Sequence, residues 1–328
     1  MPQHIAIVGD GQMGLVLAEQ LAFGGRRVRL WGPFPESLAA LEASRRSPRL
    51  PGFTLPEAVE IEPDPARALV DAEAVVSAIP VQFLRAVWSR FPPGEIPLIS
   101  VSKGIETTTL ERPLEILAEV RGPAPLAVLS GPTIASELAR HRPATMVAAS
   151  VDAGWSETVQ TLLLAPWMRI YTSPDPIGVE IAGAAKNVVA IAAGILDGLD
   201  AGYNAKSSLL ARGLAEITRL GEACGARAET FAGIAGVGDL ATTCFCPEGR
   251  NRTCGEAIGR GVPLDRHLQQ TDSVVEGVET ARAIRRLASD RGVEMPIAEA
   301  VHAVLFEGLS PHAALEGLMR RDVGSEIA

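Results

Sequence analysis

A glycine-rich turn near the start of the sequence constrains the fold more than any other feature. The apolar run Ile5 to Val8 leads into the GxGxxG segment Gly9 to Gly14, and Leu15 to Phe23 continues as a helix. Val28 to Trp31 then reads as a second strand. In this context the glycines permit a tight turn, close approach of the backbone to a pyrophosphate, and close packing of helix on strand. Because a helix N-terminus favours anions, the segment predicts a dinucleotide-binding site.

The end of the second strand leaves the form of the dinucleotide open. An acidic residue there usually binds the ribose hydroxyls of NAD, whereas a nearby arginine suits the 2′-phosphate of NADP. The chain has Trp31, Gly32 and Pro33 at this point. The nearest charged residues follow further on, at Glu36, Arg45, Arg46 and Arg49. We therefore expect NAD or NADP as the cofactor, without a choice between them.

Strand-like apolar runs alternate with helical stretches as far as Tyr171. This alternation predicts a mostly parallel, doubly wound sheet, which is a Rossmann-like α/β domain, over residues 1–177. Ligands bind beyond the carboxyl ends of the strands in such sheets. The loops Ser102 to Gly104 and Ser130 to Thr133 follow two of these strands, and Lys103 adds a cation there. Each loop alone is typical of an ordinary turn, but together they favour a binding role.

The segment TSPDPIG after Tyr171 marks a domain boundary, and only helices are predicted beyond it. We expect an all-α domain over residues 178–328. Its first helix, Gly178 to Leu196, carries Lys186 on a face of small residues that includes Gly183, Asn187, Ala190 and Gly194. Another backbone or a small ligand can approach such a face closely. Burial there would lower the pKa of the lysine toward the range useful for proton transfer, and the alternative is a lysine that reaches out to water.

Two polar segments of the helical half carry further candidates. Asp239, in Gly236 to Leu240, is suited to bind a lysine or a substrate hydroxyl, although aspartate in such a turn is more often a helix cap. Arg250 and Asn251 offer planar donors for a phosphate or carboxylate. The alternative for the second segment, Glu248 to Arg252, is a solvated surface loop.

Composition excludes several classes of partner. A net charge of −9 argues against binding to nucleic acid or an anionic membrane, so any anionic ligand must be held by a few local cations. No signal peptide is evident and no segment is predicted to span a bilayer, so we expect a cytoplasmic protein. Cys244, Cys246 and Cys254 cluster, but the next histidine is His267. That spacing favours small buried side chains over a zinc site, and no metal is expected.

Seven motifs in order along nearly the whole chain resemble bacterial-type NAD(P)-dependent glycerol-3-phosphate dehydrogenase. Enzymes of this family interconvert dihydroxyacetone phosphate and sn-glycerol 3-phosphate and feed phospholipid synthesis. The motifs are GxGxxG at Gly9 to Gly14, SKGIE at Ser102 to Glu106, SGPT at Ser130 to Thr133, GAAKNVVAI at Gly183 to Ile191, GVGDL at Gly236 to Leu240, GRNR at Gly249 to Arg252, and VVEG at Val274 to Gly277.

The resemblance implies roles for individual residues. Lys186 would be the proton donor and acceptor at the carbonyl, with Asp239 and Lys103 beside it in catalysis. The substrate would be surrounded by Lys103, Gly131, Thr133, Lys186, Asp239, Gly249, Arg250 and Asn251. The cofactor would be bound by Gly9, Gly11, Gln12, Met13, Gly14, Pro33, Lys103, Ala135, Arg250, Val274 and Glu276. Since family members are often dimers, a homodimer is also implied.

The chain departs from the family pattern mainly at positions that concern the cofactor. The family usually has a serine and a large aromatic residue where this chain has Gln12 and Met13, a basic residue at Pro33, and a tyrosine at Arg49. It also has serines where this chain has Val81 and Gly249.

Two alternatives differ in chemistry. One is a ketopantoate or β-hydroxy-acid dehydrogenase with similar domains, which does not need a pair of phosphate-binding residues. The other is a dinucleotide sensor without turnover, which has no need of Lys186.

Overall fold

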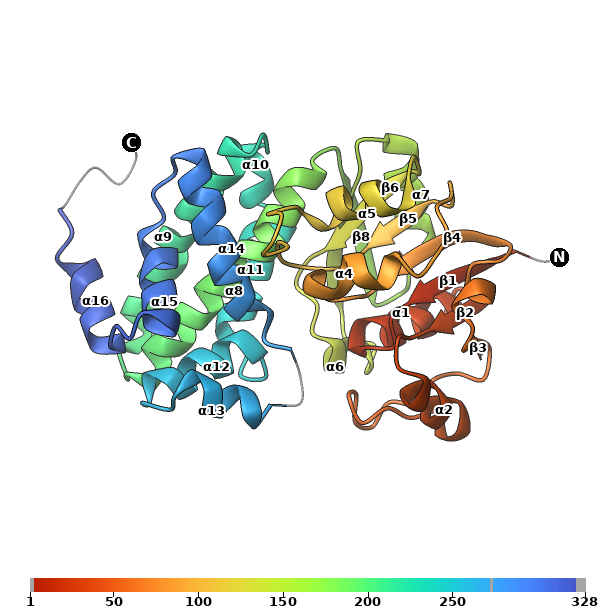
Figure 1. The fold of residues 1–328 in the computed structure, drawn as a ribbon, viewed down its shortest axis with the longest axis horizontal. Coiled ribbons are helices and arrows are strands. Elements are labelled where there is room, and N and C mark those ends of the chain that lie inside the picture. Colours follow the sequence, from red (N-terminus) through yellow and green to blue (C-terminus); the bar gives the residue numbers. More distant parts are fainter. Residues whose placement is uncertain (1–2, 272–273, 323–328) are drawn as a thin grey trace.

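The computed structural model describes residues 3–271 and 274–322. An α/β half built from the first part of the chain lies beside a helical half built from the second part (Figure 1). The last strand ends at Ser173 and the first helix of the helical half begins at Pro176. The change of architecture therefore falls within the proline-rich segment that the sequence marks as a boundary.

The α/β half contains one sheet in the order β3-β2-β1-β4-β5-β6-β7-β8 among the described residues. Neighbouring strands run parallel except β6 and β7, which are antiparallel, so the prediction of a mostly parallel sheet is confirmed. The chain passes from β1 to β2 on one side and returns to β4 on the other, which makes the end of β1 a switch point for ligand binding. The strands are β1 (His4–Val8), β2 (Val28–Trp31), β3 (Val59–Ile61), β4 (Ala72–Ser77), β5 (Leu98–Ser100), β6 (Leu126–Ser130), β7 (Ala144–Ala149) and β8 (Met168–Ser173).

Helices cover both faces of this sheet because successive side chains of each strand point in opposite directions. In β1, Ile5 and Ile7 belong to one buried cluster, whereas Ala6 and Val8 belong to another. The sequence predicts helices at Ala66 to Val70 and at Ile134 to Arg140, and both are shorter in the structure, since α3 and α6 have four residues each. The helices of this half are α1 (Gln12–Phe23), α2 (Pro35–Ser44), α3 (Pro65–Ala68), α4 (Val81–Trp88), α5 (Pro113–Arg121), α6 (Ala135–Leu138) and α7 (Ala153–Leu162).

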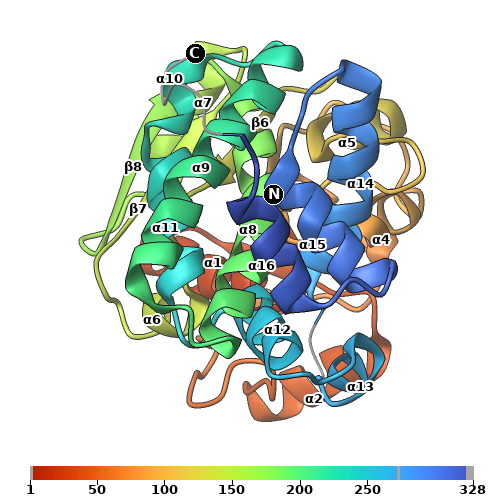
Figure 2. The ribbon, with the colours of Figure 1, turned by 90° about the vertical axis from the view of Figure 1, so that its left-hand side faces the viewer.

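The helical half is arranged around α8 (Pro176–Gly198), which Figure 2 shows among the other helices. Asp175 starts it, because Asp175 Oδ1 accepts a hydrogen bond from the Gly178 amide at 3.0 Å. The other helices are α9 (Gly202–Ala223), α10 (Ala228–Phe231), α11 (Asp239–Phe245), α12 (Arg250–Gly259), α13 (Leu264–Gln269), α14 (Glu276–Arg291), α15 (Pro296–Phe306) and α16 (Pro311–Met319), with a π-helical turn, η1 (Ile234–Gly238), before α11.

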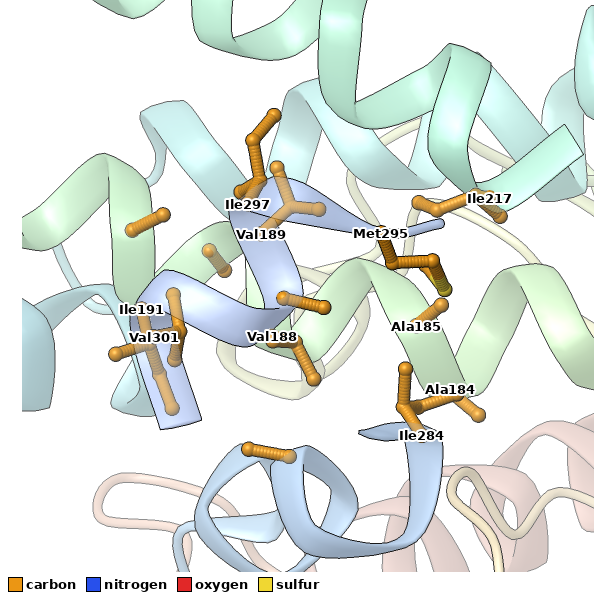
Figure 3. Packing of buried hydrophobic residues seen from close by; sticks show 14 of the residues in the cluster. Ala184, Ala185, Val188, Val189, Ile191, Ile217, Ile284, Met295, Ile297 and Val301 are labelled. Atoms are coloured by element: carbon orange, nitrogen blue, oxygen red, sulfur yellow. The ribbon is translucent and has the colours of Figure 1, made fainter. Parts of the chain in front are cut away.

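The sequence was expected to contain no segment long and uncharged enough to span a bilayer, and helix α8 corrects that expectation. It is long and apolar enough to cross a membrane by length and composition, yet its apolar window is entirely buried inside the protein. Val188, Val189 and Ile191 of α8 pack against side chains from three other helices, among them Ile217, Ile284 and Val301 (Figure 3). The helix is therefore the core of this half.

The small-residue face of α8 allows two close approaches. A Cβ atom on Gly194 would lie 1.9 Å from the carbonyl oxygen of Arg252, so the backbone of α12 rests directly on α8. One on Gly183 would lie 3.3 Å from Ser130 Oγ and 3.6 Å from Lys103 Cγ, so that end of the face meets the loops of the sheet. The predicted close approach of another backbone is confirmed.

Three elements of the helical half differ from the sequence expectation. The polar segment Glu248 to Arg252 is not a free loop, because α12 begins at Arg250 with Gly249 as its N-cap. The glycine-rich segment before Asp239 is the π-helical turn η1, where a Cβ on Gly236 would lie 2.0 Å from the Phe231 carbonyl oxygen. The helix α13 was not predicted, and none of its side chains is buried.

Candidate active site

Side chains from both halves line a cavity of about 210 Å³. It adjoins the loops after β5 and β6 and the start of α1, where the parallel strands end. The predicted site residues that line it are Gln12, Met13, Lys103, Thr133, Ala135, Lys186, Asp239, Gly249, Arg250, Asn251 and Glu276. The sequence-based site is thus largely collected in one place.

A carboxylate between two ammonium groups forms the centre of this cavity. Asp239 Oδ1 accepts from Lys186 Nζ at 2.5 Å, and its Oδ2 accepts from Lys103 Nζ at 2.7 Å. Asp239 is 1% exposed and Lys186 is 5% exposed. Lys186 therefore does not extend to water, and Asp239 does more than begin α11.

Two further contacts fix the directions of the lysines. Lys186 Nζ donates to Thr243 Oγ1 at 2.8 Å, and Thr243 lies one helical turn after Asp239 on α11. Lys103 Nζ donates to the Gly131 carbonyl oxygen at 3.3 Å, which joins the loops after β5 and β6. Thr243 was not predicted as a site residue, although its spacing of four from Asp239 places both on one face of a helix.

Burial and charge set the protonation states of this cluster. Burial lowers the pKa of Lys186 to about 7, with Asp239 opposing the shift and Lys103 adding to it. Burial opposes the ionisation of Asp239, but the two ammonium groups outweigh it and hold the pKa of that carboxyl below its usual range. Asp239 is therefore a carboxylate near neutral pH, while Lys186 can both release and take up a proton.

Donors suited to an anion lie at the first turn of α12. Arg250 Nη1 donates to the Val274 carbonyl oxygen at 2.7 Å, which uses only part of its guanidinium. Asn251 Oδ1 accepts a hydrogen bond from the Gly277 amide at 2.9 Å, and this contact fixes the orientation of the Asn251 side chain. Because α12 has no side-chain cap, its first amide groups also remain available to an anion.

Two buried polar groups at this site have no hydrogen-bond partner within the described part of the chain. They are Asn187 Nδ2, whose residue lines the cavity, and Ser130 Oγ, which lies beside Gly183 of α8. Leaving such a group unsatisfied costs about 1–3 kcal/mol. Because Asn187 is the one of the two that lines the cavity, its amide points to a polar ligand that completes the site. The sequence placed Asn187 on the same face as Lys186 without giving it a role.

The turn between β1 and α1 has the shape that a dinucleotide needs. A Cβ on Gly14 would lie 1.9 Å from the Gly9 carbonyl oxygen, and Gly9 itself has φ +123°. A Cβ on Gly11 would meet no atom within 4 Å, so the surface above the turn is open. The helix α1 begins at Gln12 without a side-chain cap, which leaves amide donors for a pyrophosphate. The residues present therefore fit the cofactor.

Some predicted residues do not line the cavity. Gly131 and Val274 contribute their carbonyl oxygens to Lys103 and Arg250 instead. Pro33 follows β2, which is separated from β5 by β1 and β4. The others outside the lining are Gly9, Gly11 and Gly14, which form the turn after β1.

Of the three clustered cysteines that were predicted to be buried, Cys244 and Cys254 are core side chains, whereas Cys246 is partly exposed and lines the cavity. Cys244 is 1% exposed and Cys254 is fully buried, and burial raises the pKa of each thiol to about 12. Within residues 3–271 and 274–322, no group of three or more histidine, cysteine or acidic side chains is arranged to hold a metal ion.

Comparisons with known proteins agree with this architecture. The chain matches the family models described as NAD-dependent glycerol-3-phosphate dehydrogenase N-terminus, over residues 4–156, and C-terminus, over residues 175–316. It is 43% identical to a glycerol-3-phosphate dehydrogenase [NAD(P)+] of Frankia casuarinae over 99% of this chain and 98% of that one. The corresponding protein of Pelotomaculum thermopropionicum is also 43% identical, over 100% of this chain and 96% of that one.

Solved structures give the same result. The crystal structure of glycerol-3-phosphate dehydrogenase from Coxiella burnetii has a TM-score of 0.94 and 34% identity, with 97% of this chain and 99% of that chain covered. A ketopantoate reductase from Ralstonia eutropha has a TM-score of 0.60 and 16% identity, covering 95% of this chain and 100% of that one, which shows a shared fold alone. The chain belongs to the NAD(P)-dependent glycerol-3-phosphate dehydrogenase family.

Proposed function

We propose that Lys186 is the proton donor and acceptor as this chain interconverts dihydroxyacetone phosphate and sn-glycerol 3-phosphate. The observation that carries the assignment is the buried Asp239 between Lys186 and Lys103 in one cavity. The lowered pKa of Lys186 suits it to exchange a proton near neutral pH.

The reaction consists of a hydride transfer and a proton transfer. When bound, the nicotinamide supplies the hydride that reduces C2 of dihydroxyacetone phosphate and accepts it in reverse. Lys186 donates a proton to the carbonyl oxygen as C2 is reduced, and it takes that proton back from the hydroxyl during oxidation. Asp239 holds the amine in place, and the ammonium of Lys103 beside it lowers the pKa of Lys186.

The substrate phosphate is assigned to the first turn of α12. Arg250 and Asn251 supply planar donors there, and the uncapped amides of the helix favour negative charge. The orphaned amide of Asn187 supplies a further donor within the same cavity. The proposed substrate residues are Lys103, Gly131, Thr133, Lys186, Asp239, Gly249, Arg250 and Asn251.

The cofactor is assigned to the open turn after β1, which would hold its pyrophosphate. In this scheme residues 1–177 bind the dinucleotide and residues 178–328 complete the substrate site. The proposed cofactor residues are Gly9, Gly11, Gln12, Met13, Gly14, Pro33, Lys103, Ala135, Arg250, Val274 and Glu276. The family resemblance further supports a cytoplasmic homodimer that supplies sn-glycerol 3-phosphate for phospholipid synthesis.

The direct test is the value of kcat/KM for dihydroxyacetone phosphate with NADH and with NADPH. We expect purified protein to oxidise at least one of them only when the keto substrate is present. Ketopantoate serves as the unphosphorylated comparison. Turnover of ketopantoate with none of dihydroxyacetone phosphate would overturn the substrate assignment.

A further inference from the structure

We propose that Arg49, held in place by Asp10 and Ser37, selects NADP(H) over NAD(H) by binding the 2′-phosphate of the adenosine ribose. The inference rests on the proposed function, since it requires a dinucleotide on the turn Gly9 to Gly14. The two residues lie beside this turn, because Arg49 and Ser37 both bind Asp10, which follows Gly9.

Asp10 lies beside the end of β2, where the sequence lacks the usual acidic residue, but it does not do the work of that residue. A Cβ on Gly32, the residue after β2, would lie 2.5 Å from Asp10 Oδ1. Asp10 Oδ2 accepts from Ser37 Oγ at 2.7 Å and from Arg49 Nη1 at 2.8 Å. Asp10 is 4% exposed, so its carboxylate is covered and paired rather than presented to a ribose hydroxyl.

The group that faces outward at this position is the Arg49 guanidinium, because the Ser37 hydroxyl donates its one proton to Asp10. The Arg49 side chain is 40% exposed, and both of its polar side-chain contacts, to Asp10 and to Ser37 at 3.3 Å, use Nη1. A guanidinium has five N–H donors, so this leaves donors for a phosphate. Ser37 lies in the first turn of α2, where the helix dipole also favours an anion.

The backbone around Arg49 is held next to the dinucleotide turn. Gln12 Nε2 donates to the Arg49 carbonyl oxygen at 2.5 Å, and Gln12 is the first residue of α1. The Arg49 guanidinium also lies 5.8 Å from the centre of the Phe34 ring. These contacts place a fixed cation between the starts of α1 and α2, where the adenosine ribose of a Rossmann-bound dinucleotide lies.

The other arginines of this segment do not offer the same site. Arg45 donates to the carbonyl oxygens of Leu55, Pro56 and Val59, so its guanidinium holds the chain between α2 and β3. Arg46 is exposed, and no side-chain hydrogen bond or ion pair fixes it among the described residues. Arg46 therefore serves as a matched control of equal charge.

The test compares binding of NADPH and NADH, followed by nicotinamide fluorescence, and of 2′,5′-ADP and 5′-ADP, followed by calorimetry. We expect the wild-type chain to bind NADPH and 2′,5′-ADP at least about 10-fold more tightly than their unphosphorylated counterparts. Arg49→Met should weaken these two ligands by about 10- to 100-fold, since a charged hydrogen bond is lost, and leave NADH and 5′-ADP within about 2-fold.

Two variants separate charge at this site from folding and from general electrostatics. Arg49→Lys keeps the cation and should retain part of the preference for NADPH, whereas Arg46→Met should leave all four affinities unchanged.

The inference would be overturned, and the proposed function left intact, if the wild-type chain bound NADH and NADPH equally tightly. The same conclusion would follow if Arg49→Met, while folded, weakened the binding of both dinucleotides equally. If neither dinucleotide binds the wild-type chain, the proposed function fails and the inference fails with it.

Discussion

Replacing Lys186 with methionine should remove catalysis while leaving the protein folded. General acid–base catalysis by one side chain contributes about 10²- to 10⁴-fold, or about 3 to 5 kcal/mol of transition-state stabilisation, so we expect kcat to fall by that factor. Asp239 also binds Lys103, at 2.7 Å, so the substitution does not leave it as an unpaired buried charge. The free energy of unfolding should therefore change by no more than about 1–2 kcal/mol.

Lys206 provides a matched control for this experiment. It is also 5% exposed, and its Nζ donates to both oxygens of Asp197, at 2.8 and 2.7 Å. Removing it leaves Asp197 paired with Arg252 at 2.7 Å, just as removing Lys186 leaves Asp239 paired with Lys103. Because Lys206 does not line the cavity, Lys206→Met should keep the wild-type kcat per folded molecule.

The assay is the initial rate of nicotinamide oxidation with saturating dihydroxyacetone phosphate, beside dinucleotide titration and thermal unfolding of each variant. Lys186→Met should bind the dinucleotide like the wild type and lose turnover. A kcat for this variant within about 3-fold of the wild-type value would refute the assignment of the proton donor. Equal losses of kcat in both lysine variants would show that buried charge, and not proton transfer, controls the rate.

Three further predictions follow from the same site and fold. Burial lowers the pKa of Lys186 to about 7, and ketone reduction needs the protonated lysine. We therefore expect kcat/KM for reduction to be flat below pH 7 and to fall above it, whereas kcat/KM for oxidation should rise up to about this pH and then level off. Profiles that are flat from pH 5 to 9 in both directions would exclude Lys186 as the proton donor. Arg250→Met should raise KM for dihydroxyacetone phosphate by about 10- to 100-fold and have little effect on turnover of unphosphorylated dihydroxyacetone, and equal effects on the two would remove Arg250 from the phosphate site. Gly194→Ala should lower the free energy of unfolding, measured in urea, by about 3 kcal/mol or more, because the added Cβ would lie 1.9 Å from the Arg252 carbonyl oxygen. Gly317→Ala on α16 is the control, since a Cβ there would meet no atom within 4 Å and should not destabilise the protein.

Features set by local sterics could be predicted from the sequence. The glycines of the turn after β1 are fixed by contacts over a few residues, and helical spacing alone placed Gly194 on the face that meets α12. The start of α12 was missed because its N-cap, Gly249, carries no side chain to signal a helix start. The helix α13 buries no side chain, so it has no apolar periodicity to detect.

Partners that are distant in sequence could not be derived from spacing. Asp239 follows Lys186 by 53 positions and Lys103 by 136, and its glycine-rich setting alone predicts a helix cap. The resemblance of the motifs grouped these residues, but it could not show that one carboxylate binds both lysines. The same applies to Asp10 and Arg49, which are 39 positions apart and meet only because the chain after α2 returns to the start of α1.

The charge balance of the cavity implies that substrate binding changes the pKa of the proton donor, Lys186. Without substrate, Lys103 and Asp239 shift the pKa of Lys186 in opposite directions, and burial lowers it. A phosphate held at the first turn of α12 adds negative charge to the same cavity of about 210 Å³, which favours the ammonium form of Lys186 and raises its pKa. Because kcat/KM reports ionisation of the free enzyme and kcat reports that of the substrate complex, the inflection for reduction should lie at higher pH in the kcat profile than in the kcat/KM profile. The separation should shrink with unphosphorylated dihydroxyacetone, and an equal separation for both substrates would show that the phosphate charge does not act on Lys186.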